Sequence, residues 1–188
     1  LEEREVTVSR VEASVTYPAN FQLVAAMNPC PCGHFPDRSR CRCTDGQITR
    51  YLQKVSGPML DRIDICVEAA PITYGDIKSS GNNESSREIR ARVEQARKIQ
   101  RERFAGENVR CNGEMSGRHI RKFCGLGREE EKFMEEIFEK LALSARMHDR
   151  ILKVARTTAD LAEEEKIRLA DLCEAVSYVK SRDKFWGN

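Results

Sequence analysis

Residues 24–43 read VAAMNPCPCGHFPDRSRCRC, and this stretch decides how the first half of the chain is interpreted. The apolar run of residues 21–27 ends at Asn28 and continues directly into four closely spaced cysteines. An almost wholly apolar run of this length is typical of a central parallel strand, because such strands are buried on both faces. The sequence therefore predicts a buried strand at residues 21–27, followed by an irregular loop that carries the cysteines.

The cysteines form two Cys-x-Cys pairs, Cys30 with Cys32 and Cys41 with Cys43, and eight residues separate the pairs. Four thiolates joined by a turn suit the tetrahedral geometry of zinc. The usual structural spacing is Cys-x-x-Cys, so free thiols on a reduced loop or a disulfide are the alternatives, and His34 is a substitute for one thiol. We expect a structural zinc site, and no catalytic zinc, since no general base stands beside the cluster.

The composition excludes several classes of protein. Of 188 residues 40% are hydrophobic, and 32 basic residues nearly balance 30 acidic ones, for a net charge of +2. Nucleic-acid binding would therefore have to come from a local patch. The sequence has neither an apolar run of about 18 residues nor a signal peptide, so we expect a cytoplasmic protein that does not enter a membrane. It starts in what reads as the middle of an element, and we expect a piece of a longer protein.

The chain divides into an α/β part followed by an all-α part. Alternating β-branched residues predict a ribbon within residues 5–15, and a second buried strand is predicted at residues 63–67. Residues 78–84, KSSGNNE, are small and polar and predict a linker. The expected division is an α/β segment with the ribbon and the cysteine loop at residues 1–78, a linker at 79–85, and a helical domain at 86–188.

Caps and periodicity predict the helices. Thr44 is expected to cap a helix that runs to about Val55. Ser85 and Glu88 match a capping box. We expect further helices at residues 86–104, 116–124, 128–142, 144–163 and 168–181.

Asn28 is a candidate catalytic residue because it follows a predicted strand. Ligands bind outside the carboxyl ends of parallel strands. A neutral amide there can orient a water or hold a phosphate oxygen without adding negative charge. The alternative is an asparagine that merely begins the turn before Pro29.

Arg62 and Arg146 are the other two candidates. Arg62 stands before the second predicted strand, where a guanidinium can stabilise charge on a transferring phosphoryl group; a surface pair with Asp61 is the alternative. Arg146 lies in the first turn of its predicted helix, where a cation is unfavourable because of the helix dipole. An anionic ligand would explain a cation at this position; a solvated basic face is the alternative. Along that helix we expect one apolar seam of Met147, Ile151, Val154, Thr158 and Leu161, beside a basic stripe of Arg146, Arg150 and Lys153.

These features occur together in one family. The chain resembles the AAA+ ATPases of the magnesium-chelatase subunit I type, most closely their ComM (YifB-like) branch. The matching stretches are VTVSR (6–10), AMNPCPCG (26–33), CRC (41–43), GPMLDRID (57–64), SAR (144–146) and RILKVART (150–157). The resemblance implies the C-terminal part of a P-loop AAA+ core with parallel strands and a Cys-rich loop, followed by a helical lid domain.

The resemblance also implies roles for the candidate residues. Asn28 would be the sensor-1 residue that positions the attacking water. Arg62 would be the arginine finger that reaches the ATP site of the next subunit in a ring, expected to be a hexamer. Arg146 would be the sensor-2 residue near the γ-phosphate, so Asn28 and Arg146 would both contact bound nucleotide. ATP and Mg²⁺ are the implied cofactors of the full-length protein.

The chain departs from the family pattern in one respect. It has no P-loop of the form GxxxxGK[ST] and no apolar strand that ends in an acidic pair for Mg²⁺. The family carries both upstream of the stretches matched here. We therefore expect ATPase activity only in a longer protein, and none from this chain alone.

Three functions remain open from the sequence. The first is a ComM-like ring motor that acts on branched DNA in recombination and natural transformation. The second is a chelatase-type motor that drives metal insertion into a porphyrin. The third is a non-enzymatic, zinc-stabilised nucleic-acid-binding module, although no aromatic residues interleave its basic run for stacking. That run is Arg87, Arg90, Arg92, Arg97, Lys98, Arg101 and Arg103.

Overall fold

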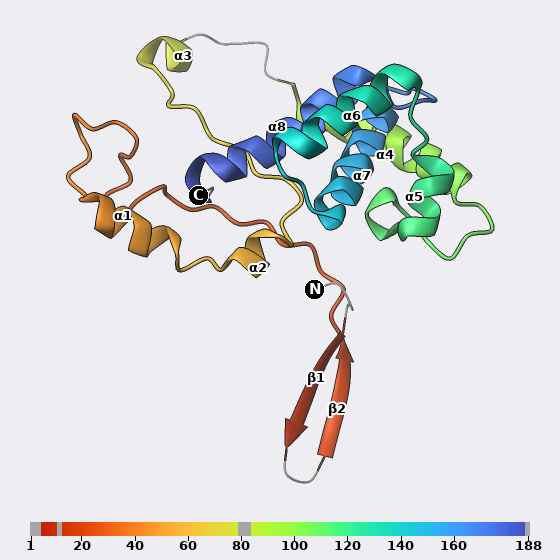
Figure 1. The fold of residues 1–188 in the computed structure, drawn as a ribbon, viewed down its shortest axis with the longest axis horizontal. Coiled ribbons are helices and arrows are strands. Elements are labelled where there is room, and N and C mark those ends of the chain that lie inside the picture. Colours follow the sequence, from red (N-terminus) through yellow and green to blue (C-terminus); the bar gives the residue numbers. More distant parts are fainter. Residues whose placement is uncertain (1–4, 11–12, 79–83, 187–188) are drawn as a thin grey trace. The chain divides into compact units, whose positions relative to one another are not determined.

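The computed structural model describes residues 5–10, 13–78 and 84–186 of the chain (Figure 1). The chain divides into two units, Leu1–Ile63 and Asp64–Asn188, and each is described by itself. Among the described helices, none is both long enough and apolar enough to cross a bilayer. The predicted boundaries at residues 78 and 86 stay a prediction, and residues 79–83 of the expected linker lie outside the described residues.

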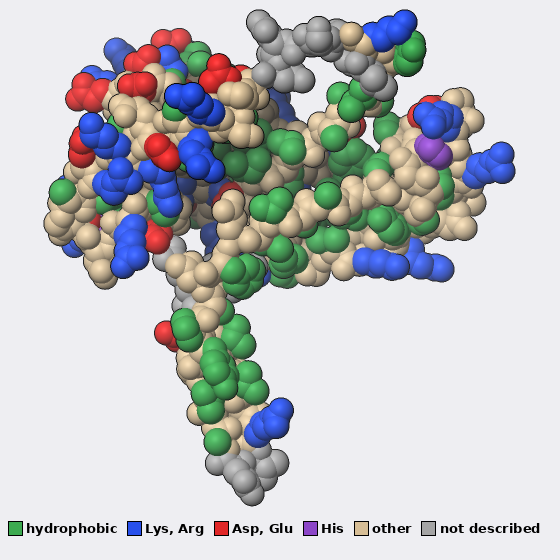
Figure 2. All heavy atoms as spheres, turned by 180° about the vertical axis from the view of Figure 1, so that it is seen from behind, with side chains coloured by type: hydrophobic (Ala, Val, Ile, Leu, Met, Phe, Trp, Pro, Cys, Tyr) green, Lys and Arg blue, Asp and Glu red, His purple; other side chains and the backbone are tan. Residues whose placement is uncertain are grey.

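The first unit begins with a two-stranded antiparallel hairpin, β1 (Glu5–Arg10) and β2 (Ala13–Pro18). Alternate residues point to the same side of a strand, so the register gives the hairpin one apolar and one hydroxyl face. The hydroxyl face carries a hydrogen bond of 3.0 Å between Thr7 Oγ1 and Thr16 Oγ1. The apolar face consists of Val6, Val8, Val15 and Tyr17, all exposed (Figure 2). The predicted ribbon is confirmed.

The two predicted buried strands are wrong for the chain as the structure describes it. Residues 21–27 and 63–67 form no strand, and Val24 is 84% exposed and Val67 73% exposed. A parallel strand needs a hydrogen-bonded neighbour and a covering layer on each face. The described residues supply neither, because β1 and β2 pair only with each other. The sheet of a P-loop core is therefore not formed within these ranges.

Two helices complete the first unit, α1 (Asp45–Leu52) and α2 (Gly57–Leu60). The predicted cap of α1 is confirmed as a capping box: the Gln47 N–H donates to Thr44 Oγ1 at 3.3 Å, and the Thr44 N–H donates to Gln47 Oε1 at 2.9 Å. α1 ends three residues before the predicted Val55. α2 starts at Gly57-Pro58, where a proline in the first turn costs no helical hydrogen bond.

The second unit is helical, as predicted (Figure 1). Its elements are α3 (Tyr74–Lys78), α4 (Ser86–Arg103), the 3₁₀ turn η1 (Asn112–Glu114), α5 (Gly117–Phe123), α6 (Arg128–Lys140), α7 (Ala145–Leu161) and α8 (Leu169–Trp186). α7 lies at the centre and packs against α4, α5, α8 and η1. Ser85 caps α4 as expected, and Ser144 caps α7. α3 was not predicted, and α8 runs five residues beyond the predicted end.

The core of this unit is formed where α7 meets α8. Its principal members are Met147, Ile151, Leu152 and Ala155 from α7 with Leu172, Ala175, Val176 and Val179 from α8. The predicted seam of α7 is confirmed at its first half, but Leu161 is 36% exposed whereas Ala159 is fully buried. The buried face repeats every four residues at Ile151, Ala155 and Ala159, and the two alanines let a neighbouring helix approach closely.

Candidate functional site

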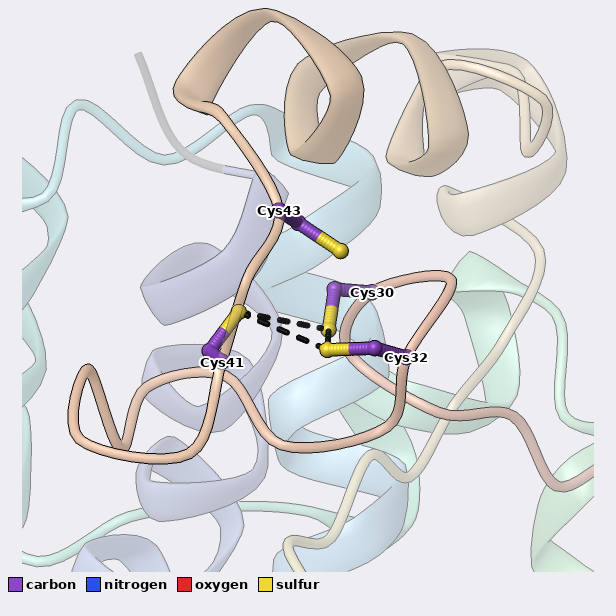
Figure 3. Close-up of side chains that lie close together, drawn as sticks. All are labelled: Cys30, Cys32, Cys41 and Cys43. Atoms are coloured by element: carbon purple, nitrogen blue, oxygen red, sulfur yellow. Dashed lines mark hydrogen bonds between the residues drawn. The ribbon is translucent and has the colours of Figure 1, made fainter.

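The four cysteines of the loop converge, as predicted (Figure 3). Cys30 Sγ lies 3.3 Å from Cys32 Sγ and 3.8 Å from Cys41 Sγ, and Cys32 Sγ lies 3.6 Å from Cys41 Sγ. Cys43 completes the group, because all four sulfur atoms lie within 4.8 Å of one another. Cys30 is buried and the other three sit nearer the surface.

These separations test whether one metal ion fits. A zinc–sulfur bond of about 2.3 Å gives a tetrahedron whose edge is about 3.8 Å. The separations among Cys30, Cys32 and Cys41, 3.3 to 3.8 Å, lie at or slightly below that edge. A disulfide bond is about 2.05 Å long, and all four cysteines are free, so the disulfide alternative is wrong here. His34 does not join the converging group within the described ranges.

Local hydrogen bonds hold the loop in this shape. Gly33 has φ of +81°, a conformation that glycine adopts without strain, and its N–H donates to the Cys30 carbonyl at 3.1 Å. The Phe35 N–H donates to Cys30 Sγ at 3.4 Å. Further along, the Cys41 N–H donates to the Asp37 carbonyl at 2.8 Å. The turns that bring the two pairs together are therefore built from the loop's own backbone.

The thiols of the cluster differ in their pKa values. A backbone hydrogen bond from His34, together with the thiol of Cys30, lowers the pKa of Cys32 to about 6. Cys43 also accepts a backbone hydrogen bond, from Cys32, but desolvation and the neighbouring thiols raise its pKa to about 11. Crowded thiols resist ionising together, whereas a bound cation would stabilise all four as thiolates. The donor set thus fits a soft divalent metal.

Asn28 lies beside this cluster. A Cβ atom placed on Gly33 would come within 3.5 Å of Asn28 Nδ2, so the amide rests against the turn between Cys30 and Gly33. Asn28 is exposed, and its side chain makes no hydrogen bond to any part of the chain that the structure describes. The loop that carries the cysteines therefore also positions the predicted sensor residue.

Arg62 belongs to the first unit, and Arg146 belongs to the second. Arg62 follows α2, is exposed, and donates from Nη1 to the Pro58 carbonyl at 2.7 Å. Arg146 is exposed in the first turn of α7, the position that the sequence predicts. The rest of the basic stripe is engaged: Arg150 pairs with Asp64 at 2.8 Å, and Lys153 donates to a backbone carbonyl. The structure brings together the four cysteines and Asn28.

The sequence did not predict a buried polar network in the helical unit. The Asp160 carboxylate, fully buried, accepts from Arg103 Nη1 at 2.7 Å, from Asn112 Nδ2 at 2.7 Å and from Arg156 Nε at 3.1 Å. Arg156 is 2% exposed, and burial lowers its pKa although Asp160 opposes the shift. The available signal was the i,i+4 pair Arg156–Asp160 beside the apolar face of α7.

Two family models match the chain. "Magnesium chelatase, subunit ChlI" matches residues 1–77, and "Magnesium chelatase, subunit ChlI C-terminal" matches residues 83–179. The first match includes the cysteine cluster and Asn28, and the second includes helices α4 to α7 with Arg146.

Curated relatives match over nearly the whole chain. The chain is 41% identical over 179 residues to "Competence protein ComM" of Haemophilus influenzae, which is 95% of this chain and 34% of that protein. It is 42% identical over 179 residues, with the same coverage, to "Uncharacterized protein YifB" of Escherichia coli. It is 35% identical over 178 residues to "Uncharacterized protein Rv2897c" of Mycobacterium tuberculosis, covering 95% of this chain and 35% of that protein. The chain spans about a third of the length of these relatives, and it belongs to the magnesium chelatase subunit ChlI family, in its ComM/YifB-like branch.

Proposed function

We propose that this chain is part of a ComM-like AAA+ ATPase that assembles as a ring, expected to be hexameric, and moves on branched DNA in recombination and natural transformation. The observation that supports this most directly is the 41% identity to a competence protein across 95% of the chain. Because the chain spans about a third of that relative, the activity is proposed for the longer protein. This chain lacks a P-loop motif, so we propose that it does not hydrolyse ATP by itself.

Three side chains of this chain would act on the nucleotide. The exposed amide of Asn28 would orient the water that attacks the γ-phosphoryl group. Arg146, at the positive end of α7, would contact the γ-phosphate region. Arg62 would stabilise the charge that develops during transfer in the neighbouring subunit, a contribution of about 10³ to 10⁵ in turnover for arginine fingers. ATP and Mg²⁺ would be held chiefly by the part of the longer protein that carries the P-loop.

The exposed apolar segments support a larger sheet in the longer protein. Phe21 is 59% exposed, Val24 84% and Val67 73%, which is unfavourable for side chains of this size in water. We propose that residues 21–27 and 63–67 become parallel strands when neighbouring strands of the longer chain pair with them. In that arrangement Asn28 would stand at the carboxyl end of a strand, where ligands of such sheets bind.

We propose a structural zinc ion for the cysteine cluster. Cys30, Cys32, Cys41 and Cys43 would be its ligands, and no step of ATP hydrolysis would pass through it. Its contribution would be to fix the loop that begins at Asn28, so that the amide keeps one position relative to the strand end. The support is the convergence of the four sulfur atoms within 4.8 Å.

Two other functions remain as alternatives. A chelatase-type motor for metal insertion into a porphyrin is favoured by the names of both matching family models. A zinc-stabilised nucleic-acid-binding module without catalysis is favoured by the exposed basic side chains of α4.

One experiment separates the three functions. ATP hydrolysis by the longer protein is measured alone, with single-stranded DNA, with branched DNA, and with a porphyrin and its metal. The proposal predicts stimulation by branched DNA above single-stranded DNA. Stimulation by the porphyrin and not by DNA would establish the chelatase alternative, and an absence of hydrolysis in every arm would leave the binding module.

A further inference from the structure

A hollow of about 340 Å³ lies on the helical unit, and its lining includes none of the residues proposed to act on ATP. Its lining combines three arginines with two apolar residues: Arg97, Arg101, Arg110, Phe104 and Val109. The three arginines are exposed, whereas Phe104 is 4% exposed and forms a floor. Phe104 packs edge-on against Phe123, with ring centroids 5.3 Å apart, so this floor is held by the core.

The fold brings these arginines together from two segments. Arg97 and Arg101 are four residues apart on α4 and therefore share one face of the helix. The chain reverses after α4 at Gly106, whose φ of +83° suits glycine. Arg110 then returns to the hollow, and its backbone N–H is fixed by the Glu114 carboxylate at 2.6 Å. Arg110 was not part of the basic run predicted from the sequence.

The guanidinium groups around the hollow differ from five other arginines of the helical unit, which are engaged in ion pairs. Arg92, Arg103, Arg118, Arg156 and Arg168 each pair with a carboxylate. Arg97, Arg101 and Arg110 form no ion pair with the described residues. Glu107, an acidic residue of the intervening turn, is engaged by Arg118 and Lys122. Like charges gathered without a counter-charge repel one another, so an anion from outside the chain would be stabilised here.

The shape of the hollow selects among anions. A free nucleotide binds where a pocket encloses most of its surface, and a stacked base needs an exposed aromatic face. Here the lining is open to solvent at three arginines, and the Phe104 ring is buried. Guanidinium groups bind phosphate oxygens with two parallel hydrogen bonds. The features favour a chain of phosphates that is held by its backbone rather than by its bases.

We propose that Arg97, Arg101 and Arg110 form a binding site for the phosphodiester backbone of a DNA strand. The basic side chains that Figure 2 shows over the helical unit are interspersed with acidic ones, so the site depends on these three groups rather than on a general positive surface. Binding through the backbone carries little sequence preference. This inference deepens the proposed function, since it gives the DNA a contact on the helical unit.

The test measures binding of a fluorescein-labelled single-stranded oligonucleotide of mixed sequence to the 188-residue chain by anisotropy, without ATP. The variant is Arg97→Gln/Arg101→Gln/Arg110→Gln. The matched control is Arg87→Gln/Arg90→Gln/Arg128→Gln, which removes the same charge from three other exposed arginines. Because all six side chains are exposed, we expect both proteins to keep the wild-type circular dichroism spectrum; if the triple variant does not, the three single variants replace it.

The Arg97→Gln/Arg101→Gln/Arg110→Gln variant is expected to bind the oligonucleotide roughly tenfold more weakly, or weaker still. The magnitude of the slope of log K against log salt concentration is expected to fall by about 2, because three single-strand phosphate contacts, worth about 0.7 each, are removed. The control should lose much less and keep most of the slope. Equal losses in the two triple variants, or no binding by the wild-type chain, would overturn the proposal. Displacement of the oligonucleotide by micromolar ADP would also overturn it, by assigning the hollow to a nucleotide.

A failure of this inference can be distinguished from a failure of the proposed function on which it rests. If DNA binding depends on the hollow but DNA does not stimulate the ATPase of the longer protein, this inference is supported and the proposed motor function is contradicted. A DNA-stimulated ATPase in which the hollow variant binds DNA normally would do the reverse.

Discussion

The Arg103 guanidinium and the Asp160 carboxylate form a bidentate ion pair that joins α4 to α7. The Asp160 side chain is fully buried and that of Arg103 is 14% exposed. Asp160 also accepts from Asn112, and Arg156 uses its remaining donors on the carbonyls of Glu164 and Glu165, at 2.6 and 2.8 Å. One carboxylate therefore holds two cations and the turn after α7.

The first prediction concerns this carboxylate. Asp160→Asn removes the negative charge that pairs with Arg103 and Arg156 in a desolvated position. Breaking a buried pair in this way costs about 3 to 5 kcal/mol in the free energy of unfolding. Urea unfolding of the chain, followed by circular dichroism at the helical band, measures the change. Glu164→Gln is the control, because its pair with Arg168 is half exposed and contributes about 0 to 1 kcal/mol. A loss no larger for Asp160→Asn than for the control would contradict the role of the network.

The second prediction concerns pH. A hydrogen bond from Lys122, against an opposing effect of desolvation and with help from Arg118, lowers the pKa of Glu107 from its ordinary 4.5. A carboxyl with a lowered folded-state pKa stabilises the fold above its ordinary pKa, and that stabilisation disappears as the pH falls through the folded-state value. The free energy of unfolding should therefore drop below pH 4.5 more steeply in the wild type than in Glu107→Gln.

Unfolding curves at several pH values measure this difference. The two proteins should differ most at neutral pH and converge in acid. A constant difference across the range would mean that Glu107 ionisation does not contribute to stability.

The third prediction concerns the metal. The chain purified under reducing conditions should contain one zinc per chain, because four converging thiols match the donor set of a structural site. Cys41→Ser should lower the zinc content well below one, measured by elemental analysis. Cys173→Ser, which alters an exposed cysteine outside the cluster, is the control and should leave it unchanged. Substantially less than one zinc in the wild type would remove the assignment.

The sequence predicted what depends on local signals. The N-cap at Thr44 and the capping box at Ser85 depend on residues at most three apart, so they were predicted and are formed. The cysteine cluster was predicted because its ligands lie within 14 residues and the loop supplies its own hydrogen bonds. The strand predicted at residues 21–27 is not formed, because a strand needs neighbouring strands to pair with, and a local stretch of sequence does not supply them.

Two features could not be predicted because they join distant residues. The network at Asp160 draws on α4, η1 and α7, and only its Arg156 pair has a local spacing. The arginine hollow combines Arg97 with Arg110 across the turn after α4. The periodicity of α4 alone suggested one continuous basic run, whereas in the structure Arg103 belongs to the buried network and Arg92 pairs with Glu84.

The central claim is that Asn28 acts within its own subunit and Arg62 on the site of its neighbour. In the longer protein, Asn28→Ala and Arg62→Ala should each bind nucleotide and lose most of their turnover, by roughly 10³ or more for Arg62→Ala. In a ring mixed from equal amounts of the two inactive variants, a site is intact when an Arg62→Ala subunit supplies Asn28 and its Asn28→Ala neighbour supplies Arg62.

The most direct measurement is therefore the ATPase activity of these mixed rings, with ring assembly checked by light scattering. At each interface, the two subunits are each the required variant in about half of the cases, so about a quarter of the sites are intact. The account therefore predicts recovery to about a quarter of wild-type turnover if the sites act independently. Mixed rings that stay as inactive as either variant alone, or an Arg62→Ala protein with wild-type turnover, would contradict it.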